Sequence, residues 1–346
     1  MPLRRSLLLS SVGGLLVVLF VLTIGHFWLK NNFSTPTHHS ESILIRVPKG
    51  TSLLGIARVL KEHQVVPYVW SFVINVALRF DAKSLKAGEY EIKPHATPRE
   101  VYDLMRSGHT YKRRITIIEG LKTEEVLSII NSQEGLVGEI SKIPAEGQLL
   151  PETYYFEYDD TRSNFLDRMQ QDMKKIVEKL WNNRAVGLPL KTQNEAVILA
   201  SIVEKETSLT EERSRVSAVF LNRLHVGMPL QADPTVVYGL ERETGKPLGR
   251  ELNKQDLTKV TSYNTYIMPG LPPTPICNPS KASLEAVLHP ARSSELYFVA
   301  DGTGGHVFSK TYAEHAVHHQ NLRKLKAQQK VAQSKDINAS SDTAKK

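Results

Sequence analysis

The chain of 346 residues contains a single cysteine, Cys277, so an internal disulfide is excluded and cysteine usage does not define the compartment. It also lacks HExxH, a CxxC pair, a Walker phosphate loop and a GxSxG elbow, which mark several enzyme classes. We therefore expect no metal and no other cofactor. With 41% hydrophobic and 23% charged residues, the composition excludes collagen-like and wholly disordered chains, and the length permits two domains.

A net excess of positive charge is absent from most of the chain, although the net charge of the whole is +8. Residues 321–346 carry +5 of it, and Arg4 and Arg5 add two more, which leaves the region between nearly neutral. A folded basic face for nucleic acid is thus not indicated, and we expect no nucleic-acid partner. Residues 327–346 are polar and poor in aromatics, and are interpreted as a disordered tail.

Residues 7–29 contain no Lys, Arg, Asp or Glu. A helix of this length measures about 34 Å, enough to cross a hydrocarbon core of about 30 Å. A cleaved signal peptide is the alternative, but its apolar region is shorter and ends in small residues, whereas this one ends in His26, Phe27 and Trp28. We therefore expect an uncleaved single-pass anchor. Arg4 and Arg5 place its N-terminus in the cytoplasm and the rest outside the inner (cytoplasmic) membrane.

Residues 1–30 are thus a cytoplasmic stub and anchor, and the polar residues 31–42 are interpreted as a linker. Over residues 43–109 the pattern predicts a small α/β module in the order strand, helix, strand, helix. Thr51 or Ser52 is the expected cap of its first helix, Thr97 the cap of its second, and Gly108 the stop. Residues 113–326 form a larger, mainly helical domain with short strands. The fold class is therefore α+β. Helices are predicted at 123–130, 163–183, 193–207, 210–225 and 310–326, and strands at 113–118 and 296–302.

The predicted helix 193–207 carries the strongest candidate for an acid catalyst. Leu199, Ile202, Val203 and Glu206 stand at i, i+3, i+4 and i+7, so Glu206 continues the apolar stripe. A carboxyl against apolar surface has a raised pKa and can donate a proton near neutral pH. The alternative is a solvated glutamate at a helix end, paired with a basic neighbour such as Lys205 or Arg213.

Two loops combine turn residues with amides, hydroxyls and aromatic rings: LQADPTVVYG (230–239) and SYNTYIMPGLPP (262–273). Amides and hydroxyls could bind sugar hydroxyl and N-acetyl groups, and tyrosine rings could stack on pyranose faces. The alternative is loop architecture held by turns. The amide and hydroxyl candidates are Gln231, Asn264 and Thr265, and the aromatic candidates are Tyr238, Tyr263 and Tyr266. His315 and His319 stand at i and i+4, but without a third ligand we interpret them as surface residues.

At these residues the sequence closely resembles the YceG-like family of endolytic murein transglycosylases. The matching blocks run along nearly the whole chain. They are ASIVEKET (200–207), VFLNRL (219–224), LQADPTVVYG (230–239), SYNTY (262–266), GLPPTPICNPS (270–280), HPA (289–291) and YFVADGTGGHVFSKTYAEH (297–315). The resemblance implies that residues 43–109 are LysM-like and that residues 113–326 are catalytic. It also implies cleavage of the β-1,4 bond between N-acetylmuramic acid and N-acetylglucosamine in peptidoglycan strands, which terminates nascent strands.

The family's essential acid falls on Glu206. Glu152, in LLPETYYF (149–156), stands where the family usually has Asp, and with Tyr154 it is counted as a substrate-binding candidate. Thr274 and Ser280 replace expected glycines. The resemblance further implies contact with cell-wall synthases, the penicillin-binding proteins.

We expect a lytic transglycosylase in which Glu206 acts first as acid and then as base. One carboxyl suffices for that chemistry, whereas hydrolysis ordinarily uses two. Two alternatives remain open. One is a muramidase-type hydrolase with Glu152 or Asp233 as second carboxylate, and the other is a non-catalytic peptidoglycan-binding anchor. Asp233 is otherwise a substrate-binding candidate.

Overall fold

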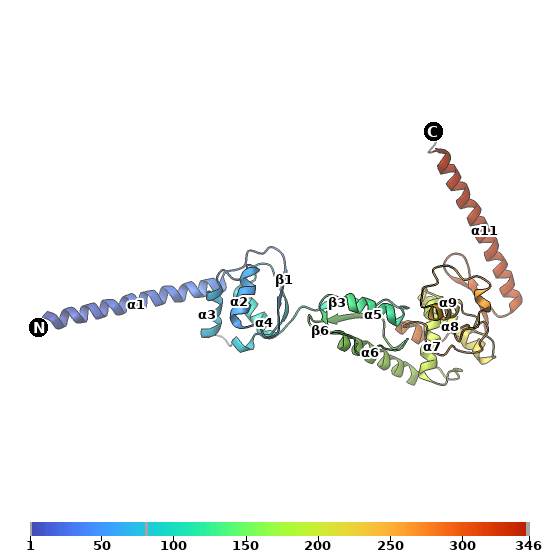
Figure 1. Cartoon of the computed structure of the whole chain (residues 1–346), viewed down its shortest axis with the longest axis horizontal. Helices are drawn as coiled ribbons and strands as arrows, with labels where there is room; N and C mark the ends of the chain where they lie inside the picture. The colour runs from blue at the N-terminus through green and yellow to red at the C-terminus, as the bar shows by residue number, and fades with distance from the viewer. Residues whose placement is uncertain (1, 80–81, 344–346) are drawn as a thin grey trace. The chain divides into compact units, whose positions relative to one another are not determined.

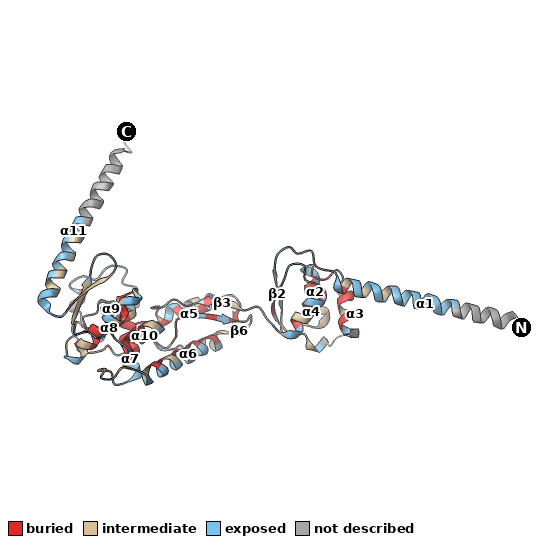
Figure 2. Cartoon of the chain, turned by 180° about the vertical axis from the view of Figure 1, so that it is seen from behind, coloured by how far each residue is buried: buried red, intermediate tan, exposed pale blue. Residues whose placement is uncertain are grey.

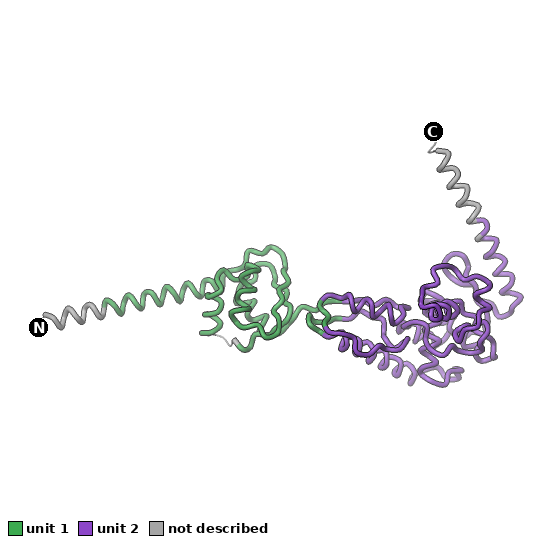
Figure 3. The backbone as a smooth tube through the Cα atoms, viewed as in Figure 1, with its two compact units in different colours: residues 1–114, 135–137, 155–160 green, residues 115–134, 138–154, 161–346 purple. Residues whose placement is uncertain are grey.

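The computed structural model describes residues 2–79 and 82–343 (Figure 1). The chain divides into two compact units (Figure 3). The first combines residues 1–114 with the short segments 135–137 and 155–160, and the second holds the remaining residues. Helices predominate and the strands occur in two-stranded sheets, so the α+β class is confirmed.

The first unit begins with helix α1 (Pro2–Ser34). Its part Gly13–Ser34 has a mean hydropathy of 1.8 and is long and apolar enough to cross a membrane. The helix continues through residues 31–34, which the sequence placed in a linker. The reason is tertiary packing: Phe33 is buried and its ring lies 5.9 Å from that of Phe72. The first turn after the anchor is therefore part of a folded module.

This module is built on strand β1 (Ile43–Val47), which pairs antiparallel with β2 (Gly88–Ile92) in the register Ile43↔Ile92 to Val47↔Gly88. Alternate strand residues, including Ile45 and Tyr90, enter the core. The helices are α2 (Leu53–Glu62), α3 (Val69–Arg79), a 3-10 turn η1 (Ala82–Ser84) and α4 (Pro98–Ser107).

The predicted helix ends in this module are confirmed at three places. The Ser52 hydroxyl caps α2, Thr97 and Glu100 form a reciprocal capping box on α4, and Gly108 ends α4 with φ 75°. Helix α3 was missing from the predicted order, because its outward face is apolar and its polar residues, Ser71 and Asn75, are buried, so no polar face marks it as a surface helix.

Residues 113–182 form two strand pairs and two helices; β4 (Leu136–Val137) and parts of the other three strands are counted with the first unit, and both helices with the second. Strand β3 (Arg113–Thr116) pairs with β5 (Thr153–Phe156), and β4 (Leu136–Val137) with β6 (Asp160–Thr161). The helices are α5 (Thr123–Ser132) and α6 (Arg162–Asn182).

The remainder of this unit surrounds helix α7 (Gln193–Glu206), of which residues 196–203 are all buried (Figure 2). A helix buried on all sides is the centre of its core. Helices α8 and α10 pack directly on α7. The surrounding elements are α8 (Thr210–His225), α9 (Asp233–Thr244), η2 (Asp256–Thr258) and α10 (Lys281–Leu288).

The unit ends in the antiparallel hairpin of β7 (Tyr297–Ala300) and β8 (His306–Ser309), followed by α11 (Tyr312–Thr343). Helix α11 continues well beyond residue 326, where the sequence analysis ended the helix and began a disordered tail. The added residues to 343 contain no Gly or Pro and are rich in the strong helix formers Ala, Lys and Gln, which accounts for the extension.

Candidate active site

Glu206 is the last residue of α7, and the backbone becomes extended at Thr207. The three preceding residues of its stripe, Leu199, Ile202 and Val203, are fully buried. Glu206 itself is only partly exposed, and no hydrogen bond to it is found among the described residues. Its carboxyl thus borders the apolar core without the donors that would hold it ionised.

Burial, and to a lesser extent the negative charge of Asp233, raise the pKa of Glu206 to about 8 against the opposing positive charge of Arg223. A carboxyl with this pKa is mostly protonated at neutral pH. It can therefore donate a proton to a bound leaving group and then act as a base.

Asp233 begins helix α9 and accepts a hydrogen bond of 2.6 Å from the hydroxyl of Tyr266. Burial, this bond to Asp233 and the nearby charge of Glu206 raise the pKa of Tyr266, so its hydroxyl stays neutral and remains a donor. The structure thus brings Glu206, Asp233 and Tyr266 into one electrostatic cluster.

Arg223, on α8, supplies the positive charge of this cluster from a buried position. Its guanidinium donates to the carbonyls of Leu230 and Leu296, both at 2.7 Å, and lies 5.4 Å from the centre of the Tyr297 ring. Arg223 therefore ties α8 to the loop before α9 and to β7 while facing Glu206.

The loop that carries Gln231 and Asp233 is held by Thr265. The Thr265 hydroxyl accepts from the Ala232 amide at 3.0 Å and bonds to the Thr235 hydroxyl at 2.9 Å. Gln231 is exposed and has φ 49°, a conformation that costs a non-glycine residue about 1 kcal/mol or more and that clusters at functional sites. The loop is thus fixed with the Gln231 side chain toward solvent.

Several predicted sugar-binding residues are internal. Asn264 is fully buried and donates to the carbonyls of Leu257 and Lys259, and Thr265 is occupied as described. The Tyr263 ring is buried against that of Tyr238, with centroids 4.9 Å apart. These side chains organise the two loops from within.

Glu152 and Tyr154 lie on another part of the same unit. The Tyr154 hydroxyl is buried and donates to the Leu150 carbonyl at 2.9 Å, while Glu152 is exposed and accepts from the amide of Thr153. Neither contributes to the electrostatics of Glu206, which depend on Asp233 and Arg223.

The neighbouring Glu204 points to the opposite side of α7, as the helical spacing predicts. It is buried, pairs with Arg213 at 3.3 Å and accepts from both the amide and the hydroxyl of Ser280. The pairing with Arg213 considered for a helix-end glutamate thus belongs to Glu204. Thr274 and Ser280, which stand where the family pattern has glycines, both form hydrogen bonds through their hydroxyls. The Thr274 hydroxyl lies 2.7 Å from the Tyr263 hydroxyl.

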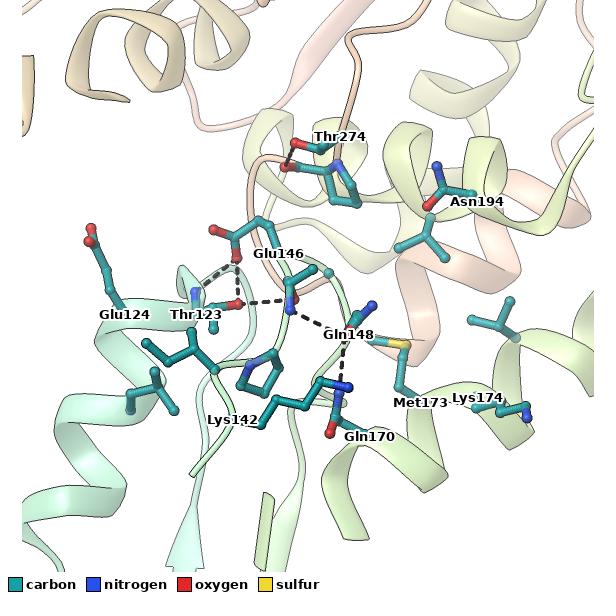
Figure 4. Close-up of a pocket in the computed structure, with 18 of the residues that line it drawn as sticks. Thr123, Glu124, Lys142, Glu146, Gln148, Gln170, Met173, Lys174, Asn194 and Thr274 are labelled. Atoms are coloured by element: carbon teal, nitrogen blue, oxygen red, sulfur yellow. Dashed lines mark hydrogen bonds between the residues drawn. The ribbon is translucent and has the colours of Figure 1, made fainter. Parts of the chain in front are cut away.

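A cavity of about 1000 Å³ lies between α5, α6 and the start of α7, at the end of that helix opposite Glu206 (Figure 4). In it Glu146 accepts from the amide and hydroxyl of Thr123, and the side chains of Gln148 and Gln170 bond to each other. A second cavity of similar volume includes Asp233. Both are lined by Glu124 and Tyr238. Asp233 therefore borders an open cavity, whereas Glu206 is not among the residues that line these two.

Sequence reasoning missed Arg223, Tyr297 and Glu146. Arg223 carries a readable signal, because it is the only charge in the apolar block VFLNRL. Tyr297 and Glu146 are identified only by tertiary packing. His315 stacks on Tyr297 with centroids 5.2 Å apart, and the part of the chain that the structure describes holds no group of three or more His, Cys, Asp or Glu that could bind a metal.

A carboxyl of raised pKa thus lies at the end of a buried helix in a mainly helical domain, where it could serve as an acid catalyst. Comparison with known proteins identifies the family of the chain. The model of the YceG-like family matches residues 45–321. The chain belongs to this family.

Two relatives carry the same name. The endolytic murein transglycosylase of Bacillus subtilis strain 168 is 30% identical over 306 residues, covering 79% of this chain and 83% of the relative. The endolytic murein transglycosylase of Streptococcus pneumoniae serotype 2 is 25% identical over 350 residues, and the match spans 62% of that longer relative. A crystal structure of a YceG-like protein from Listeria monocytogenes is 29% identical and superposes on 80% of this chain with a TM-score of 0.49.

Proposed function

We propose that this protein is a peptidoglycan lytic transglycosylase that cleaves glycan strands internally at the bond between N-acetylmuramic acid and N-acetylglucosamine. The observation that carries the proposal is Glu206, a carboxyl of raised pKa where the family resemblance of the sequence places the acid. The two relatives named endolytic murein transglycosylase support the substrate class.

In the proposed reaction, protonated Glu206 gives its proton to the glycosidic oxygen while positive charge develops at C1 of the muramic acid. The bond breaks, and the N-acetylglucosamine leaves with a free hydroxyl. The Glu206 carboxylate then removes the proton of the muramic acid C6 hydroxyl, whose oxygen attacks C1. The product is a 1,6-anhydro sugar, no water is consumed, and the acid is regenerated.

The neighbours of Glu206 have separate roles in this scheme. The Asp233 charge favours the protonated starting form, and Arg223 stabilises the carboxylate formed after the first step. The exposed Gln231 is the strongest candidate for a direct sugar contact. We assign positioning roles within the loops to Tyr238, Tyr263, Asn264 and Thr265. Glu152 and Tyr154 have no role at Glu206 in this scheme, because their hydrogen bonds are local and neither affects its pKa.

Two further features complete the proposal. Helix α1 anchors the chain in the cytoplasmic membrane with its N-terminus inside, since Arg4 and Arg5 precede the span. The order β1, α2, α3, β2 fits a LysM-like module that holds glycan strands. Penicillin-binding proteins remain proposed partners on the basis of the family resemblance.

The deciding experiment weighs the products that the protein releases from purified peptidoglycan. We expect anhydro ends in the wild type and a loss of turnover of about a hundredfold or more in Glu206→Gln, since general acid catalysis contributes roughly that much. Products with reducing ends, heavier by one water, would establish the hydrolase instead. Binding without strand shortening would establish the non-catalytic anchor.

A further inference from the structure

Helix α3 carries an apolar surface that no described residue covers. Between Val69 and Leu78 it contains no charged residue. Trp70, Ile74 and Leu78 stand at i, i+4 and i+8 on one face and are 64%, 36% and 75% exposed. The solvent-facing side of a surface helix is normally polar, so the exposed apolar face of α3 is typical of a helix that contacts an apolar surface.

The other face of α3 fixes it to the end of the anchor. The Asn75 amide donates to the Leu29 carbonyl of α1 at 3.0 Å, and the Tyr68 ring lies 5.4 Å from that of Trp28. Phe72 packs against Phe33 in the core of the module. Helix α3 is therefore level with the last residues of the apolar span.

The position of α3 along the anchor indicates what its apolar face contacts. The anchor spans about 30 Å of hydrocarbon with residues 7–29, so Trp28 and Leu29 stand at the outer boundary of the bilayer. Tryptophan and tyrosine are enriched at this boundary, and Trp28, Tyr68 and Trp70 are all exposed there. An apolar helix face at this depth meets lipid headgroups and the first acyl carbons.

We propose that α3 lies in the outer membrane-water interface, with Trp70, Ile74 and Leu78 inserted among phospholipids. The small module is then attached to the bilayer by two contacts, the spanning α1 and the interfacial α3. This attachment is independent of the catalytic reaction.

The test uses the full chain in phosphatidylethanolamine and phosphatidylglycerol vesicles containing lipid with a spin label near the headgroup. The chain has three tryptophans, Trp28, Trp70 and Trp181, so paired substitutions by Phe leave one at a time. Trp181, in the second unit, is the control. We expect the label to quench Trp70 and Trp28 at least about twofold more than Trp181, as befits residues within a few ångström of the headgroups.

The outcomes separate this inference from the anchor. Quenching of Trp28 without Trp70 overturns the interfacial position of α3 and leaves the anchor intact, whereas quenching of neither overturns both. Protection of Trp70 that appears only at high protein-to-lipid ratio assigns the face to a second copy of the chain and also overturns the proposal. Circular dichroism of each variant verifies that the fold is retained.

Discussion

At the scale of single residues, the proposed chemistry depends on one proton at Glu206. Its pKa reflects burial at the end of α7 and two opposing charges, Asp233 and Arg223. Because these contributions come from different residues, each can be changed separately.

The pH profile is the first prediction. Activity requires protonated Glu206, so it should fall as pH rises through about 8. Asp233→Asn removes a negative charge that raises this pKa, and the fall should therefore move to lower pH. The measurement is kcat/KM against pH for wild type and variant. Tyr266→Phe, which leaves the Asp233 charge in place, should not produce that downward shift.

The same experiment distinguishes the two enzyme mechanisms. If Asp233 were the second carboxylate of a hydrolase, Asp233→Asn would lose activity at every pH instead of shifting its profile.

The second prediction concerns stability. The pKa of Glu206 is 4.5 in ordinary surroundings and about 8 here, so between these values the folded protein holds a proton that the unfolded chain releases. Stability from this group is therefore lost as pH rises across that window. Glu206→Gln should raise the free energy of unfolding at pH 8 by about 1 to 3 kcal/mol, and by much less near pH 5.

Urea unfolding at the two pH values measures this effect. Glu152→Gln, at an exposed carboxylate, is the matched control and should show no such pH-dependent gain. Equal stability of Glu206→Gln and wild type at both pH values would mean that the acid is not held in a desolvated position.

At the scale of elements, the orientation of α7 is maintained by contacts on the side opposite the acid. Ser280 caps α10 by accepting from the Ser283 amide at 3.2 Å and donates to Glu204 on α7 at 2.5 Å. One hydroxyl thus joins the start of one helix to the end of another.

The third prediction follows. Ser280→Ala removes both bonds and should lower the free energy of unfolding by about 1 to 2 kcal/mol, the usual cost of a lost cap with a buried partner. Ser141→Ala, at an exposed loop position, is the control. Chemical denaturation of the two variants is the measurement, and similar effects in both would show that the Ser280 bonds contribute nothing net.

Helix ends fixed by local chemistry were predictable from sequence, and elements fixed by tertiary contact were not. Ser52, Thr97 and Gly108 act as expected, because capping requires only neighbouring residues. Helix α3 escaped prediction because its outward face is apolar, and α9 because its first residues, Asp233 to Gly239, were interpreted as part of a loop.

The same distinction between local and tertiary causes applies to the candidate site. The helical stripe of α7 predicted that Glu206 borders the apolar core, as it does, whereas the internal positions of Asn264 and Thr265 depend on partners up to 33 positions away in the chain. Loop composition alone cannot distinguish a sugar contact from a residue that holds the loop.

At the scale of the whole molecule, the two compact units have separate cores. Phe33 belongs to the core of the first unit, although it lies on the same helix as the membrane span. Substitution of Phe33 should therefore destabilise the first unit and leave the second unit unaffected.

The fourth prediction tests that separation. Phe33→Ala should destabilise the first unit by about 3 kcal/mol or more, as expected for a buried aromatic residue. Cleavage of soluble glycan by the second unit should stay near the wild-type rate. Hydrogen exchange of β1 and β2 measures the first effect, and a glycan assay the second. Phe27→Ala, at an exposed residue, is the control, and exchange that is equally fast in both variants contradicts the assignment.

The position of Phe33 also affects how the protein can be shed. With α1 as the proposed anchor, a protease cutting between residues 34 and 42 would release a fragment that has left one of its own core side chains, Phe33, on the anchor. Shedding and unfolding of the small module are thereby coupled, so the module retains its full stability only in molecules that keep their anchor.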